Sequence, residues 1–184
     1  IEDMTISNGL PLHTWRSTSV KCEGKFVDNR TNVCLTQACE NFLNTLSMEL
    51  ASGRNFSSDY SADSKNCLVN ETFVKQFGWD RPIGKWIENE EQRYLVVGVI
   101  KDFHREQIHF PIRPYLLLLR DEGFGKDNNL AFKIDPETTE SSLNHINSVL
   151  REAFPNVLFE VNDYDAGTYR MALEVWENAK NTFA

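Results

Sequence analysis

A short segment, VIKDFHREQIH (99–109), gathers side chains that could do acid–base or metal chemistry. Asp102 and His104 are two positions apart, so in an extended segment they would point to one face, as an acid–base pair would. His104 and His109 could instead join a carboxylate in binding zinc or copper, because imidazole suits both metals. A third interpretation is that these residues only end a strand and begin its loop.

Motifs elsewhere in the chain support neither catalysis nor metal binding. No serine or cysteine lies in a nucleophile-elbow pattern, and the spacing of the two histidines matches no standard ligand motif. The segment GFGK (123–126) lacks the remaining glycines and the Ser/Thr of a phosphate loop, so we interpret it as a turn. Loop histidines are more often solvated or hydrogen-bonded than bound to metal. We therefore expect a non-enzymatic domain with no catalytic residues, no cofactor and no metal.

The composition is that of a folded soluble domain. Of 184 residues, 41% are hydrophobic and 25% are charged, and this length suits one domain or two small subdomains. A formal net charge of −8, without a local cluster of Lys and Arg, argues against a nucleic-acid partner. No apolar run approaches the roughly 20 residues that cross a bilayer, and the longest, YLLLL (115–119), predicts a buried strand. The chain opens at Ile1 without a signal peptide, so we expect a piece of a longer protein.

The cysteines do not form a recognisable disulfide or metal framework. Cys22, Cys34, Cys39 and Cys67 are too few for a disulfide scaffold, and none of their spacings is Cys-x-x-Cys. Cys22 and Cys34 flank a predicted turn, so they could face each other across two antiparallel strands. The alternative is that all four are small buried hydrophobes. Their disulfide state stays open.

Hydrophobic periodicity predicts strands in the first half of the chain and a short helix between them. Strands are expected at 18–27 and 32–39, a helix at 40–48 and a turn at Gly53. GKWIEN and RYLVVGVI then predict a hairpin joined through Glu90 and Glu91.

The segment CLVNETFVKQFGW (67–79) predicts a strand that leads into a helix. Phe73, Val74 and Phe77 share one helical face and Gly78 ends the helix, while Asn70 stands where a cap belongs. The large side chains of Trp79 and Trp86 are expected to pack in the core rather than to line a binding surface.

The last third predicts a strand–helix–strand unit. LAFKI (130–134) and VLFEV (157–161) alternate as strands do, and Asp135 followed by Pro136 suits a helix cap. The crossover is long enough for parallel strands or a split β-α-β arrangement. The helical face between the strands carries Leu143, Ile146, Leu150 and Phe154, with Pro155 as its stop.

The final segment, TYRMALEVWENAKNTFA (168–184), predicts a second amphipathic helix without a capping residue at its end. Its apolar stripe consists of Tyr169, Leu173, Trp176, Lys180 and Phe183.

Several short strings occur together and in order, and they resemble the extracytoplasmic core domain of MacB-like ABC transporter permeases, within the wider FtsX-type family. The usual sequence pattern of that family contains, in order, GR-x-F, a vNE segment, G-W, P-I-G-K, then G-V-V-x-D-F-H and a proline-rich strand entry. The resemblance resumes at FPNVLFEVNDYDAGTYRMALEV (154–175), while Gln107 and Ile100 depart from the usual serine and valine. The matching strings are LSMELASGRNFS (46–57), CLVNETFVKQFGW (67–79), DRPIGKWI (80–87), YLVVGVIKDFHREQIH (94–109) and PIRPYLLLL (111–119).

The resemblance implies an α+β fold in two parts. A porter-like split β-α-β subdomain would comprise residues 1–56 and 99–184, and a smaller, mostly β subdomain would be inserted at 57–98. Asp102 and His104 would be hydrogen-bonding residues that fix the junction where the chain returns from the insert. The matched motif residues would have structural roles only: Gly53, Arg54, Asn70, Glu71, Gly78, Pro82, Gly84, Lys85, Gly98, Asp102, Phe103, His104 and Pro114.

The implied function is that of a non-catalytic, periplasmic domain of an inner-membrane ABC transporter permease. It would lie between the first two of four transmembrane helices and couple their motion to substrate or partner handling outside the membrane. Its partners would be those helices and a cytoplasmic ATPase subunit, with a permease homodimer and a periplasmic adaptor as further candidates.

Two other functions stay open at this point. An extracytoplasmic ligand-sensing domain of a membrane receptor would have a ligand pocket. A secreted metal-binding enzyme would use His104 and His109.

Overall fold

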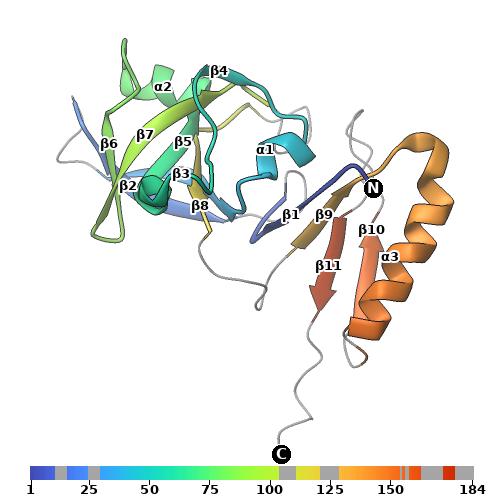
Figure 1. Ribbon diagram of the computed structural model, residues 1–184. Coiled ribbons are helices and arrows are strands. Elements are labelled where there is room, and N and C mark those ends of the chain that lie inside the picture. The colour runs from blue at the N-terminus through green and yellow to red at the C-terminus, as the bar shows by residue number, and fades with distance from the viewer. Residues whose placement is uncertain are drawn as a thin grey trace, which may run out of the picture.

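A closed barrel of β-strands forms the larger part of the computed structural model (Figure 1). The structure describes residues 1–10, 16–24, 30–103, 111–120, 129–153 and 155, and the backbone of 158–162 and 172–176. Hydrogen-bonded pairing runs β3–β2–β6–β7–β5–β8, and β8 pairs in parallel with β3, so the path returns to its start. Closure leaves these strands without a free edge. The strands are β2 (Ser17–Cys22), β3 (Thr31–Ala38), β5 (Asn66–Asn70), β6 (Trp86–Asn89), β7 (Gln92–Ile100) and β8 (Tyr115–Leu119).

Strand β8 shows why the run YLLLL is apolar at every position. Tyr115 and Leu117 belong to one buried cluster, whereas Leu116 and Leu118 belong to a second cluster on the opposite face. Because successive side chains of a strand point to opposite faces, a strand covered on both sides must be apolar throughout. The prediction of a buried strand here is confirmed.

A smaller group of strands with one helix on it lies beside the barrel (Figure 1). Strand β11 lies between β9 and β10 and is antiparallel to both, so β9 and β10 run parallel to each other. Strand β1 pairs with β9 along its length and meets β3 at Ser7 and Ala38, which joins this group of strands to the barrel. The elements are β1 (Asp3–Ser7), β9 (Asn129–Lys133), the 3-10 turn η2 (Pro136–Thr138), α3 (Thr139–Ala153), β10 (Leu158–Asn162) and β11 (Ala172–Trp176).

The helix α3 forms where the sequence predicts it. Ile146 and Leu150 pack with Leu130 and Phe132 of β9 in a third buried cluster. Asp135 caps the preceding turn, because its Oδ1 accepts a hydrogen bond of 2.9 Å from the backbone N–H of Glu137. Phe154 lies outside the described residues.

The strand–helix unit at β5 and α2 (Glu71–Phe77) is also confirmed. The Asn70 side chain accepts a hydrogen bond from the N–H of Phe73, and Gly78 ends the helix in the left-handed conformation with φ 63°. The N–H groups of Gly78 and Trp79 donate to the carbonyls of Lys75 and Val74, which closes the last turn.

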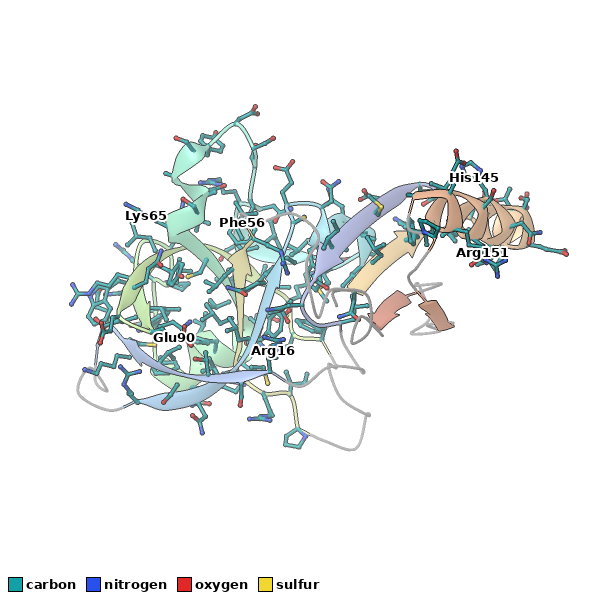
Figure 2. The ribbon with its side chains drawn as sticks, turned by 90° about the horizontal axis from the view of Figure 1, so that it is seen from below. Arg16, Phe56, Lys65, Glu90, His145 and Arg151 are labelled. Carbon is teal, nitrogen blue, oxygen red and sulfur yellow. The ribbon has the colours of Figure 1, made fainter. Side chains whose placement is uncertain are left out.

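Three short elements complete the described structure. Helix α1 (Phe42–Thr45) lies within the predicted range 40–48, β4 (Leu50–Gly53) pairs with β7, and η1 (Ser61–Lys65) is a 3-10 helix. The β6–β7 hairpin turns at Glu90 and Glu91, whose φ values of 48° and 69° are typical of a tight hairpin turn. Figure 2 shows this turn at one end of the molecule and α3, with His145 and Arg151, at the other.

One local prediction is wrong, and one of the two alternatives left open for the cysteines does not hold. Residues 172–176 form the strand β11, not part of a helix, because each of them pairs with β10 and residues 172–174 also pair with β9. Cys22 and Cys34 do not face each other, since β2 and β3 pair Ser17 with Cys34, and Cys22 pairs with Ile87 of β6. All four cysteines are free, and only Cys39 is not fully buried.

The architecture is a mixed α and β fold with a core dominated by sheet, as predicted in outline. In the described ranges, each helix is too short or too polar to span a membrane.

We expect Gly98→Ala to destabilise the protein more than Gly78→Ala. A Cβ at Gly98 would lie 2.3 Å from the backbone oxygen of Arg54 and 2.8 Å from Leu68 Cδ2, whereas nothing lies within 4 Å at Gly78. Gly78→Ala therefore strains only the backbone, at about 1 kcal/mol, while Gly98→Ala should cost about 3 kcal/mol or more. Urea unfolding measures both free energies. Equal losses would contradict the close approach of the two backbones at Gly98.

Candidate functional site

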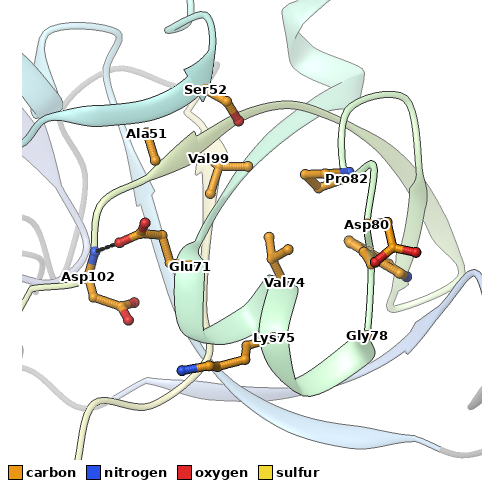
Figure 3. A pocket seen from close by; sticks show the side chains of 11 residues that line it. Ala51, Ser52, Glu71, Val74, Lys75, Gly78, Asp80, Pro82, Val99 and Asp102 are labelled. Atoms are coloured by element: carbon orange, nitrogen blue, oxygen red, sulfur yellow. Dashed lines mark hydrogen bonds between the residues drawn. The ribbon is translucent and has the colours of Figure 1, made fainter.

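The carboxylate of Asp102 sits in a network of hydrogen bonds at the end of β7. Its Oδ1 accepts from Asn70 Nδ2 and from the N–H of Thr72, each at 2.9 Å, and its Oδ2 accepts from Thr72 Oγ1 at 2.8 Å. The N–H of Asp102 donates to Glu71 Oε2 at 2.9 Å (Figure 3). The start of α2 and the end of β7 are therefore held together by both side chains and backbone.

Asn70, which is 1% exposed, links three segments through its amide. Its Oδ1 accepts from the N–H groups of Phe73 and Tyr115, at 3.0 and 2.9 Å. Its Nδ2 donates to Asp102 and also to the carbonyl of Arg113, at 3.1 Å. A buried amide has two donors and two lone pairs, and all are used here.

Two neighbours extend this junction toward β8. The ring of Phe103 meets the Tyr115 ring edge-on at 5.0 Å between centroids. The carbonyl of Pro114 accepts from the N–H of Cys34 at 2.8 Å, at the point where β8 begins to pair with β3. His104, His109 and the GFGK segment lie outside the described residues.

A second group of motif residues surrounds the end of β4. Gly53 pairs with Gly98 of β7. A Cβ on Gly53 would lie 2.3 Å from the Val97 oxygen, and a Cβ on Gly98 would lie 2.3 Å from the Arg54 oxygen. Next in sequence, Arg54 forms a two-pronged ion pair with Asp63, with distances of 2.7 and 2.8 Å. Its guanidinium also lies 4.4 Å from the centroid of the Tyr60 ring.

Asp63 is a buried acid that the sequence analysis did not single out. Besides Arg54, it accepts hydrogen bonds from the N–H of Ser57 and from Asn66 Nδ2, at 2.9 and 2.7 Å. The hydrogen bonds from Arg54 are the largest cause that lowers the pKa of Asp63 from 3.8 to about 2. The residues around Asp63 are mostly small or charged, as in a surface segment, so the local sequence carries no signal that this acid is buried.

A third group lies in the turn before β6. The N–H of Gly84, whose φ is 84°, donates to the Val96 carbonyl at 2.8 Å, and that of Lys85 donates to the carbonyl of Pro82 at 3.1 Å. The Lys85 ammonium forms an ion pair with Glu23, whose carbonyl accepts from Trp79 Nε1 at 2.8 Å. Trp79 is buried as expected, whereas Trp86 is half-buried with Arg93 over its ring.

These three groups of residues tie together segments that are distant in sequence. The carboxylates of Asp102 and Asp63 already accept internal hydrogen bonds, and burial raises the pKa of the Cys22 thiol to about 12. Burial likewise raises the pKa of the Cys67 thiol. Across the ranges that the structure describes, no three His, Cys, Asp or Glu residues gather in a way that would hold a metal ion.

One open groove of about 660 Å³ lies beside the Asp102 network, between α2, β4 and the turn at 80–82 (Figure 3). We call it the α2–β4 groove. It is lined by Ala51, Ser52, Glu71, Val74, Lys75, Gly78, Trp79, Asp80, Pro82, Val99 and Asp102.

The family follows from the match to a known domain type. The MacB-like periplasmic core domain family matches residues 10–146, which include all three groups of motif residues. The chain belongs to this family. A search of curated proteins found no match.

Solved structures share the fold of this MacB-like domain. The periplasmic region of MacB from Actinobacillus actinomycetemcomitans is 17% identical, with a TM-score of 0.51 over 83% of this chain and 68% of that chain. A domain assigned to a permease protein of Porphyromonas gingivalis is 17% identical, with a TM-score of 0.57 over 100% of this chain and 80% of that chain.

Family membership confirms two of the predictions made from the sequence. The resemblance to MacB-like permease domains is correct, and the chain is an extracytoplasmic part of a membrane protein related to ABC transporter permeases.

We expect Asp63→Asn to remove stability at neutral pH but much less in acid. The carboxyl has a pKa of about 2 when folded and 3.8 otherwise, so its contribution is present above about pH 5 and is lost as the pH falls through about 2. The variant should lose about 2 kcal/mol near pH 7, and the difference from wild type should narrow in acid. Urea titrations across this pH range measure it. Asp59→Asn, an exposed acid nearby, serves as control, and a difference that stays constant with pH would contradict the ion pair's role.

We expect Asn70→Asp to destabilise the protein more at neutral pH than in acid. The substitution puts a second carboxylate where the amide now donates to Asp102 Oδ1 at 2.9 Å, so one pKa of the pair rises on folding. The stability is therefore retained below the unfolded pKa and lost as the pH rises, by about 3 kcal/mol near neutrality. Thermal unfolding at acid and neutral pH tests this.

The matched control is Asn41→Asp, because the exposed Asn41 Nδ2 donates to Asp3 Oδ1 at 3.2 Å. Its effect should stay below about 1 kcal/mol. An equal loss for Asn70→Asp at every pH would show that repulsion between carboxylates is not the cause.

Proposed function

We propose that this domain is a non-catalytic coupling element of an ABC transporter permease. In this proposal a separate cytoplasmic ATPase moves the transmembrane helices, and the domain relays that motion to a substrate or partner outside the membrane. Membership in the MacB-like family supports the proposed location of the domain, outside the membrane in a permease. Engagement of a second permease copy and of a periplasmic adaptor belongs to the same proposal.

The observation that carries this proposal is the pairing of the first and last described strands. Both β1 and β11 hydrogen-bond to β9: Thr5 pairs with Ala131, and Ala131 pairs with Ala172. Since both are antiparallel to β9, β1 and β11 run parallel to each other. A displacement along either strand is therefore resisted by several ladder hydrogen bonds of β9 at once.

A division into two parts is included in the proposal. The porter-like subdomain would come from 1–56 and 99–184, and the topology of β9, α3, β10 and the intervening β11 supports a split β-α-β unit in it. The inserted β-rich subdomain would centre on 57–98. Because β6 pairs with β2 and β5 pairs with β8, the barrel supports an extension of the β-rich part to 17–119.

In this proposal the motif residues make the domain stiff enough to transmit the motion of the transmembrane helices. The junction of Asn70 and Asp102, the glycine pair at β4 and β7, and the turn at Lys85 each tie segments that are distant in sequence. We propose structural roles for all of them, and the same role for His104.

A flexible insertion tests the proposal in a permease that carries this domain. About six Gly and Ser residues placed before Asp3 should uncouple the domain, because flexible linkers transmit little force. We expect transport to fall at least tenfold while ATP hydrolysis continues. The same insertion between Glu90 and Glu91, in the exposed hairpin turn, is the control and should leave transport within twofold. Full transport with the insertion before Asp3 would refute coupling through β1.

A further inference from the structure

The α2–β4 groove combines an apolar floor with small residues on one wall. Val99, which is 4% exposed, forms the floor, with the half-buried side chains of Val74 and Pro82 beside it. Ala51 and Ser52 of β4 line the opposite wall and leave it open (Figure 3). Ile83, next to Pro82, is 46% exposed although it is a large apolar residue. Concave sites with exposed apolar surface are where proteins bind ligands and partners.

The charged side chains that line the groove differ in whether they already have hydrogen-bond or ion-pair partners within the chain. Asp102 accepts three hydrogen bonds from Asn70 and Thr72, and Glu71 accepts one from the N–H of Asp102. By contrast, the exposed carboxylate of Asp80 makes no side-chain hydrogen bond or ion pair within the described part of the chain. Asp80 is thus the lining acid without a side-chain partner among the described residues, so its carboxylate can pair with a cation of a ligand.

The overall electrostatics favour a cationic ligand. The lining carries the carboxylates of Glu71, Asp80 and Asp102 against the single ammonium of Lys75. The chain as a whole has a formal charge of −8, so a basic group is attracted from a distance as well.

We propose that the α2–β4 groove binds an extended segment of a partner protein, which places a lysine or arginine side chain at Asp80 and an apolar side chain on Val74 and Val99. An open groove suits a chain segment better than a small molecule, because small-molecule sites enclose most of their ligand. This inference rests on the proposed function for the presence of a partner outside the membrane. It adds the location and the chemistry of that contact.

Selection of peptides on the 184-residue chain tests the proposal. The probe is a phage-displayed library of random peptides of about twelve residues, long enough to span the groove. We expect the selected peptides to carry Lys or Arg next to apolar residues. Titration of the best peptide against Asp80→Lys should show affinity at least tenfold weaker than for wild type.

Two matched controls separate the groove from general attraction. Asp59→Lys makes the same change in charge at an exposed site outside the groove lining and should change the affinity less than twofold. Val74→Ser should weaken binding at least fivefold, whereas Gln76→Ser, on the exposed face of the same helix, should not. All four positions are exposed or half-buried, so the variants are expected to fold.

Three results would overturn the proposal. They are the recovery of no binding peptide, peptides without basic residues, or an equal loss of affinity for Asp59→Lys and Asp80→Lys. Sedimentation that shows self-association, abolished by Asp80→Lys, would identify a second copy of the chain as the occupant instead. Because this test involves no transport, its failure is distinct from failure of the coupling proposal.

Discussion

The structure depends on central strands that are buried on both faces. Strands β5 and β8 place alternate side chains in two different apolar clusters, with Leu68 and Leu117 in one and Val69 and Leu116 in the other. Each cluster therefore needs its own cover: α2 packs over one and α1 lies in the other. A strand buried on two faces removes apolar area from water on both of them. This burial stabilises the folded state by about 25 cal/mol per Å².

The polar contacts at the strand ends follow from that burial. A buried backbone group without a partner costs about as much as a lost hydrogen bond, so the chain ends of β5, β7 and β8 need donors and acceptors. Asn70 supplies them to Phe73, Tyr115 and Arg113 at once. Asp102 then satisfies the remaining amide hydrogen of Asn70. In the described part of that segment, the polar groups of Asp102 are paired with those of Asn70, Glu71 and Thr72.

The family motifs lie at three places in the barrel. At each place, the geometry of the backbone or its hydrogen bonds requires a particular residue type. At Gly53 and Gly98 two backbones approach too closely for any Cβ. At the turn of Gly84 a positive φ is needed, and at Asn70 an amide must bond in four directions. A domain that transmits motion benefits from such joints, because they limit sliding between neighbouring strands. The α2–β4 groove is lined by residues of two of these places, so a bound segment would contact the strands and helix that they tie together.

The sequence by itself determined the elements whose signals are local. The helix α2 between Asn70 and Gly78, the hairpin through Glu90 and α3 after Asp135 all follow from caps, turns and periodicity within a few residues. The motif strings also identified the family. Only the tertiary structure decided the conformation of 172–176. Leu173 and Trp176 fit the apolar stripe of a helix, but pairing with β9 and β10 makes this segment a strand.

The register of Cys22, the buried Asp63 and the available carboxylate of Asp80 likewise became visible only in three dimensions. Each depends on partners that are distant in sequence or on a surface that several segments share, and local sequence patterns do not encode those distances.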